Sequence, residues 1–338
     1  MRTACRVALG TAVVAGAVMV ASRIAARRPA VAAVPAELRN PVLYLRFELR
    51  SERQLNMGRR LLARGMPPVA GVELAEQTAP GLEGTSDVRI VTYEPAGREQ
   101  PSGALLWIHG GGMVMGTTAQ DDRFCSSLAD ELGILVASVD YRLAPENPYP
   151  APLDDCMAAL RWLHDSAGAL GVDAQRIAVG GASAGGGLAA GLSLRARDEG
   201  GPPICFQLLN YPMLDDRTVL ADDHEGRGEF IWTPGSNEFG WSAYMGGPPR
   251  PDDDRHHAAP GRADDLSGLP SAWIGVGELD LFQAEDVAYA ARLVAAGVPC
   301  RLHEVEGMYH GADQAAAKAP SMQEYRESML SALREAIC

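Results

Sequence analysis

The chain has 338 residues, of which 47% are hydrophobic, 22% charged and 6% aromatic, with 43 acidic residues against 30 basic ones. This is the composition of an ordinary globular protein, and it excludes intrinsic disorder, collagen and coiled coil. The formal net charge of -13 would repel phosphate backbones, so we expect no nucleic acid partner.

Residues 7–22 form an uncharged apolar run, slightly shorter than the roughly 20 residues that span a bilayer as a helix. The flanking arginines are Arg2, Arg6, Arg23, Arg27 and Arg28. Three of them follow the run directly, which favours a retained membrane anchor over a cleaved secretory signal. We therefore expect residues 1–28 to be a separate segment that associates the chain with a membrane. Two alternatives stay open for this segment: a cleaved signal, which gives a secreted protein, and a helix lying on a surface. A cytoplasmic location also stays open.

Between Glu37 and Ala63, leucines and a phenylalanine recur at helical spacing among charged residues. The pattern predicts one or two amphipathic helices that end near Gly65 and the Pro67-Pro68 pair. We assign residues 37–70 to a helical cap.

From about residue 85, expected strands and helices alternate along the chain. The expected strands are 87–93, 104–108, 134–139, 177–179, 205–209, 272–276 and 300–305. The expected helices are 121–132, 152–166, 184–197, 285–296 and 321–337. This succession predicts an α/β fold, in which a mainly parallel sheet is covered by helices on both faces. We assign residues 85–338 to this domain.

The section from 215 to 270 interrupts the alternation with a long polar, proline-rich and glycine-rich stretch. Its large aromatic residues are Phe230, Trp232, Trp241 and Tyr244. Insertions between regular elements commonly form lids or pocket walls. We expect residues 215–250 to complete the cap.

The strand at 177–179 runs into a glycine-rich turn and then directly into a helix. Gly181-Ala182-Ser183-Ala184-Gly185 matches the G-x-S-x-G pattern of a nucleophile elbow. The glycines are needed because a sharp turn from strand to helix brings neighbouring backbone too close for larger side chains. Ser183 is expected at the helix N-terminus, above the carboxyl edge of the sheet.

A second motif, His109-Gly110-Gly111-Gly112, follows the strand at 104–108. Its glycines leave backbone N–H groups uncovered, so that they can point at an oxyanion. We expect His109 to shape this loop rather than to move protons. Residues 140–142 are expected to brace it.

Taken together, the motifs resemble the hormone-sensitive-lipase-like branch of the α/β-hydrolases over about residues 85–335. The segments that carry this resemblance are His109–Gly112, Val139–Glu146, Pro150–Asp155, Gly181–Gly186 and the surroundings of Asp280 and His310. One departure is Ala182, because many relatives have Asp before the nucleophile.

The resemblance implies that Ser183 is the nucleophile, His310 its base, and Asp280 the carboxylate that orients the histidine. It also implies that the oxyanion hole consists of the N–H groups of Gly111, Gly112 and Ala184, with His109, Gly110, Gly181 and Gly185 in supporting positions. The chain order Ser, Asp, His is the order that this fold uses.

The physical chemistry of the residues agrees with these roles. A serine hydroxyl becomes a useful nucleophile when an imidazole removes its proton, and a carboxylate fixes the tautomer of that imidazole. Asp280 and His310 each follow an expected strand, so both belong at the same sheet edge as Ser183. The alternatives are Glu278 or Asp286 for the acid and His303 for the base.

We expect neither a metal nor a cofactor. The sequence Asp252-Asp253-Asp254-Arg255-His256-His257 suggests metal ligands, but adjacent histidines point apart in most backbones and no established ligand spacing is present. We interpret it as a solvated acidic loop. The glycine run 180–187 lacks the residues of a phosphate loop and the spacing of a dinucleotide site.

These features predict a serine hydrolase that cleaves small carboxylic esters of short to medium acyl chain through an acyl-enzyme. An amidase or deacetylase is the nearest alternative, because amides and esters share a tetrahedral intermediate. The family also contains receptors that bind small molecules without hydrolysing them. The presence of all three triad residues argues against such a pure binding role.

Overall fold

The computed structural model describes residue 22 and residues 24–45, 47–82 and 84–338. It contains one eight-stranded sheet in the order β1-β2-β4-β3-β5-β6-β7-β8. Strands β1 and β2 pair antiparallel with each other, β2 pairs antiparallel with β4, and all other neighbours are parallel. The predicted fold class is therefore confirmed.

The strands agree well with the predicted ranges, with two exceptions. They are β1 Val72–Ala79, β2 Val88–Pro95, β3 Ser102–Ile108, β4 Leu135–Asp140, β5 Val172–Ala182, β6 Phe206–Asn210, β7 Ser271–Gly277 and β8 Cys300–Val305. The first exception, β1, is a largely exposed edge strand without an apolar run, and it was not predicted. The second, β5, begins five residues earlier than predicted, because its first half is polar.

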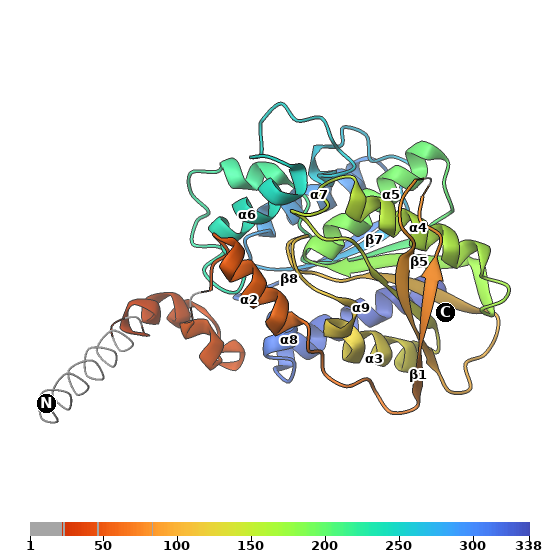
Figure 1. Cartoon of the computed structure of the whole chain (residues 1–338). Helices are drawn as coiled ribbons and strands as arrows, with labels where there is room; N and C mark the ends of the chain where they lie inside the picture. The colour runs from red at the N-terminus through yellow and green to blue at the C-terminus, as the bar shows by residue number, and fades with distance from the viewer. Residues whose placement is uncertain (1–21, 23, 46, 83) are drawn as a thin grey trace, which may run out of the picture.

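The described helices are α2 Glu52–Leu62, α3 Asp122–Leu132, α4 Ala151–Asp165, α5 Ala184–Glu199, α6 Pro234–Met245, α7 Gln283–Ala295, α8 Ala312–Ala315 and α9 Pro320–Ile337. Figure 1 shows α4, α5 and α7 on one face of the sheet and α3 and α9 on the other. The predicted helices of the α/β part are confirmed, and the short α8 was not predicted.

The sheet has a hydrophobic core on each of its two faces, and alternate residues of the central strand β3 contribute to one core or the other. Leu106 and Ile108 pack with the residues of α4 and α5, whereas Leu105 and Trp107 pack with those of α3 and α9. Successive side chains of a strand point to opposite faces, so a fully apolar strand serves both layers. Because the strands from β4 to β8 in the sheet order are parallel, their carboxyl ends and the loops that follow them lie at one edge of the sheet.

The segment before the sheet contains the helix α2 and two short turns. Two short 3-10 turns, Ala36–Leu38 and Pro41–Tyr44, precede α2, whose first turn is capped by the Ser51 hydroxyl accepting from the Gln54 N–H. In the insertion, α6 is flanked by 3-10 turns at Asp216–Leu220 and Pro260–Arg262. The two regions touch, because the Leu49 N–H donates to the Ser236 hydroxyl over 2.9 Å.

The N-terminal segment packs onto the body of the protein. Residues 24–33 are helical, and Val31, Val34 and Leu38 are buried. Residues 7–21 of the predicted apolar run lie outside the described residues. Within the ranges that the structure describes, no helix combines the length and the apolar character needed to cross a bilayer.

Candidate active site

Ser183 lies at the turn between β5 and α5, in a backbone conformation that side chains rarely adopt, with φ 56° and ψ -122°. The flanking glycines make this turn possible. A Cβ at Gly185 would overlap the carbonyl oxygen of Ile108, and a Cβ at Gly181 would overlap the backbone of Gly185. The strand-turn-helix context required of a nucleophile elbow is therefore present.

Ser183, His310 and Asp280 form a continuous chain of hydrogen bonds. The Ser183 Oγ lies 3.0 Å from the Nε2 of His310, and the Nδ1 of His310 lies 2.8 Å from the Oδ2 of Asp280. All three residues are at most 6% exposed. Because a carboxylate accepts and does not donate, the histidine proton belongs on Nδ1, which leaves the Nε2 lone pair free to accept from the serine.

Loops after β7 and β8 carry the acid and the base to this point. The Leu279 N–H donates to the Met308 carbonyl over 2.9 Å, which joins the two loops. The Phe282 N–H donates to the Oδ1 of Asp280 over 3.0 Å, so the carboxylate is held from both sides. The rings of Tyr211 and Phe282 contact the imidazole of His310 edge-on, at centroid distances of 4.7 and 5.3 Å.

The alternative acids and base lie elsewhere. The Oε2 of Glu278 accepts from the Gly307 N–H over 3.0 Å, so Glu278 braces the loop that leads to His310. Asp286 is buried in α7, where burial raises its pKa well above the usual value. His303 lies in β8, with its ring 5.5 Å from that of Tyr325.

The glycine loop after β3 lies beside the nucleophile. A Cβ at Gly110 would come within 2.8 Å of the Ala182 carbonyl oxygen and 3.4 Å of the Ser183 Cβ. Gly111 and Gly112 have φ values of 124° and 64°, which are accessible to glycine and turn the loop back sharply. Ala184 is the first residue of α5, so its N–H has no acceptor within that helix. The structure thus brings the three predicted oxyanion donors to the vicinity of Ser183.

His109 is fully buried in the base of this loop. Its ring stacks on Tyr141 at 4.2 Å, and its Nδ1 lies 2.9 Å from the Gly110 carbonyl oxygen. The Tyr141 hydroxyl donates to the His109 carbonyl over 3.0 Å. Burial lowers the pKa of His109 to about 4, so the ring is uncharged at neutral pH. These contacts support a role in shaping the loop.

The buried neutral histidine predicts a pH-dependent stability. Between pH 6.5 and about 4 the unfolded chain protonates residue 109 and the folded chain does not, so acid lowers the free energy of unfolding. Wild type is expected to lose free energy of unfolding between pH 7.5 and 4.5. We expect this loss to be smaller by about 2 to 3 kcal/mol in His109→Gln. Urea unfolding of both proteins at the two pH values measures this difference. Equal losses in both proteins would contradict it.

A buried polar cluster behind the triad was missed by the sequence analysis. The Tyr211 hydroxyl donates to Asp313 over 2.8 Å, and the Asn210 amide donates to the same carboxylate over 3.3 Å. The Asn210 carbonyl in turn accepts from the Ser183 N–H over 2.9 Å. Burial raises the pKa of Asp313. Asp313 comes three residues after His310 and matches no catalytic pattern, so no sequence signal distinguished it.

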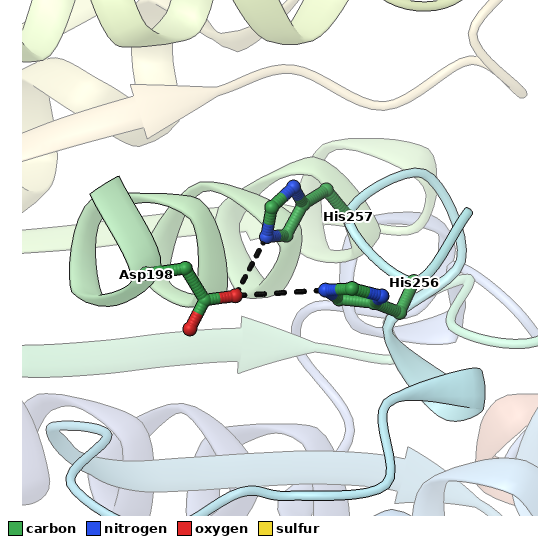
Figure 2. Close-up of side chains that lie close together, drawn as sticks. All are labelled: Asp198, His256 and His257. Carbon is green, nitrogen blue, oxygen red and sulfur yellow. Dashed lines mark hydrogen bonds and ion pairs between the residues drawn. The ribbon is translucent and has the colours of Figure 1, made fainter. Parts of the chain in front are cut away.

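Outside this site, one group of residues within the described part of the chain has the composition of a metal site. Asp198, at the end of α5, meets His256 and His257 of the insertion, and Figure 2 shows both rings directed at its carboxylate. The sequence analysis expected the adjacent histidines to point apart. They do not, because the loop folds back over α5.

Comparisons with known proteins identify the family of the chain. A family model described as the alpha/beta hydrolase fold matches residues 105–314, which include Ser183, Asp280 and His310. The chain belongs to this family of α/β-hydrolases. The esterase LipI of Mycobacterium tuberculosis is 38% identical to this α/β-hydrolase over 273 residues, covering 79% of this chain and 82% of LipI.

Solved structures show the same relationship. A bacterial heroin esterase superposes with a TM-score of 0.84 at 39% identity, covering 90% of this α/β-hydrolase and 98% of the esterase. The esterase LipW of Mycobacterium marinum superposes with a TM-score of 0.78 at 34% identity, covering 90% and 96% of the two chains.

Proposed function

We propose that the protein is a serine carboxylesterase that acts on small esters of short to medium acyl chain. The observation that carries this proposal is the hydrogen-bonded chain from the Ser183 hydroxyl through His310 to Asp280. The esterase names of its relatives support the same reaction class.

In the proposed reaction, the Ser183 Oγ attacks the acyl carbon while the Nε2 of His310 takes its proton. Asp280 stabilises the imidazolium that forms. The N–H groups of Gly111, Gly112 and Ala184 donate to the oxyanion. The intermediate collapses, and His310 returns the proton to the departing alcohol. Water then attacks the acyl-enzyme, with His310 again as base, and releases the acid and the free serine.

A panel of chromogenic esters of increasing acyl length tests this proposal on the full chain. We expect turnover that peaks at a short or medium acyl chain. Matched acyl anilides test the amide-cleaving alternative. Faster cleavage of the anilides than of the esters would favour an amidase or deacetylase, and cleavage of neither class would contradict the proposal.

We further propose that residues 37–70 and the insertion 215–250 form a cap that selects the acyl group. At Gly58 of α2 a Cβ would come within 2.8 Å of the Met115 Sδ, next to the glycine loop. The guanidinium of Arg59 donates to the Val114 and Ala144 carbonyls over 2.8 and 3.0 Å, which fastens α2 to this loop. From the insertion, the Trp232 ring lies so close to Gly112 that a Cβ there would overlap it.

Trp232→Ala is expected to shift the acyl preference toward longer chains. The ring is buried, and its Nε1 donates to the Asn237 Oδ1 over 3.2 Å, so its position is fixed. Removing it opens space beside the oxyanion donors, and we expect the octanoyl-to-acetyl ratio of kcat/KM to rise about tenfold. Trp162→Ala, in α4, is the control. An unchanged ratio in folded Trp232→Ala protein would show that this ring does not bound the acyl site.

We also propose that residues 7–22 attach the protein to a membrane. The support is the apolar run and the arginines that follow it. Fractionation of cells that express the full chain tests this proposal. Recovery in the membrane fraction until detergent is added is expected, and recovery in the soluble or culture fraction would contradict it.

A further inference from the structure

Three side chains of metal-ligating type converge at the C-terminal end of α5, and the proposed reaction uses none of them (Figure 2). The Oδ2 of Asp198 lies 2.7 Å from the Nε2 of His257 and 3.5 Å from the Nε2 of His256. All three ligand atoms lie within 4.8 Å of one another. In a tetrahedral zinc site with bonds of about 2.0 to 2.1 Å, ligand atoms are about 3.3 Å apart, so small side-chain movements suffice to admit an ion.

Contacts around the cluster orient each ligand. Arg197 donates from Nε to the Oδ1 of Asp198 over 2.8 Å, which leaves Oδ2 directed at the histidines. The Nδ1 of His256 lies 3.3 Å from the Asp254 carbonyl oxygen. Metal-bound histidines commonly donate their other ring N–H to a carbonyl or carboxylate in this way. The Nε2 lone pair of His256 then faces the carboxylate oxygen of Asp198.

The loop that carries the histidines is itself held in place. Arg255 pairs with Asp253 through two nitrogens and donates from Nη1 to the Met245 carbonyl over 2.9 Å. At Gly191 of α5 a Cβ would overlap the His257 carbonyl oxygen, so the loop lies directly on the helix. Both histidines are therefore presented to Asp198 by a packed backbone rather than by a free surface loop.

The chemistry of these ligands suits a divalent cation. In the tautomer whose Nδ1–H donates to the Asp254 carbonyl, the Nε2 of His256 presents a lone pair to the Asp198 carboxylate oxygen, and two lone pairs repel each other. A positive charge between them removes the repulsion. A divalent ion satisfies both imidazoles and the carboxylate at once, and imidazole with carboxylate is a ligand set suited to zinc, copper or nickel.

We propose that Asp198, His256 and His257 bind one divalent transition-metal ion, with Zn²⁺ as the expected ion and water completing the coordination. The exposures of the Asp198, His256 and His257 side chains are 31%, 44% and 20%, so the site is open to solvent on one side. The ion can enter from this open side, and water can occupy the coordination positions that the three side chains leave free.

The site is structural rather than catalytic. Asp198 comes fifteen positions after Ser183 along α5. At a rise of 1.5 Å per residue, the two residues are about 22 Å apart along the helix axis. An ion at this distance does not touch the ester. It instead joins the end of α5 to the segment between α6 and β7, a long connection of few regular elements. Because binding requires the folded loop, the ion stabilises the folded protein.

Titration of the untagged full chain, stripped of metal with a chelator and then dialysed, tests the proposal. Isothermal titration with Zn²⁺ is expected to give one equivalent bound, and Co²⁺ is expected to give visible absorption bands that Zn²⁺ abolishes. His257→Ala and Asp198→Asn are each expected to weaken Zn²⁺ binding by at least about tenfold. His164→Ala, which removes a partly exposed histidine of α4, is the matched control and should bind as wild type does.

Far-UV circular dichroism of each variant without metal checks that the fold is retained, and His256→Ala serves as a third variant if one of the others is unfolded. Zn²⁺ is also expected to raise the midpoint of thermal unfolding in wild type and in His164→Ala but not in His257→Ala. Absence of a one-to-one complex in wild type, or equal affinity in wild type and in the folded ligand variants, would overturn the proposal.

Discussion

Ser183→Ala is expected to lower kcat/KM for the best ester of the panel by about 10⁴- to 10⁶-fold. The variant lacks the oxygen that attacks the acyl carbon, so no acyl-enzyme forms and only the oxyanion donors remain to assist water. Alanine fits the site, because the Ser183 side chain contributes only its hydroxyl to the contact with His310. Initial rates measured at several ester concentrations give the ratio.

A matched control separates loss of the nucleophile from loss of structure. Ser193 is a buried serine of the same helix, α5, where its hydroxyl donates to the Ala189 carbonyl over 2.9 Å. Ser193→Ala is expected to retain activity within a few fold. A fluorophosphonate should label wild type and Ser193→Ala but not Ser183→Ala. Labelling of Ser183→Ala at another residue, or loss of less than tenfold in rate, would refute the assignment of the nucleophile.

Asp280→Asn is expected to lower kcat by about 10³- to 10⁴-fold with little change in KM. The amide oxygen replaces Oδ1 as acceptor for the Phe282 N–H, which directs the amide NH₂ toward His310. The Nδ1 of His310 must then accept, so its proton moves to Nε2. An imidazole with this tautomer cannot take the proton of the Ser183 hydroxyl.

Glu278→Gln tests whether the effect belongs to Asp280 in particular. Glu278 lies two residues earlier and was the alternative acid, but its carboxylate accepts from the Gly307 N–H and a glutamine oxygen can do the same. We expect this variant to keep at least about a third of wild-type kcat. A loss in Glu278→Gln as large as that in Asp280→Asn would mean that the acid was assigned to the wrong residue.

Buried apolar strands made most of the sheet predictable. The strands β3, β4 and β6 are rich in apolar residues and buried almost throughout, and such segments stand out between polar turns. The edge strand β1 pairs on one side only, and its sequence mixes apolar and small residues with Glu73 and Glu76 without strict alternation, so it carries a weak signal. Its place in the sheet depends on pairing with β2, a contact that local sequence does not encode.

The site was predictable where backbone geometry dictates residue type. Gly181 and Gly185 are required by close approach of other backbone, and that requirement produces a recognisable pattern around Ser183. Asp313 and the cluster of Asp198 with two histidines follow no such pattern. Each depends on residues brought together by the packing of separate loops, which only the folded structure shows.

The N-terminal part of the described chain contacts both the insertion and the loop that carries His310. The guanidinium of Arg27 pairs with Glu229 over 2.8 Å and lies over the Phe230 ring at 4.8 Å. Further along, the Leu38 carbonyl accepts from the Tyr309 hydroxyl over 3.2 Å, next to His310 in the chain.

This packing leaves few residues between the apolar run, which ends at residue 22, and the first of these contacts at Arg27. If the run is held at a membrane, as proposed above, the catalytic domain follows it along the chain after only these few residues. Proteolysis after residue 33 would remove Arg27 and Val31 together and uncover the Phe230 ring, which Arg27 covers in the intact chain.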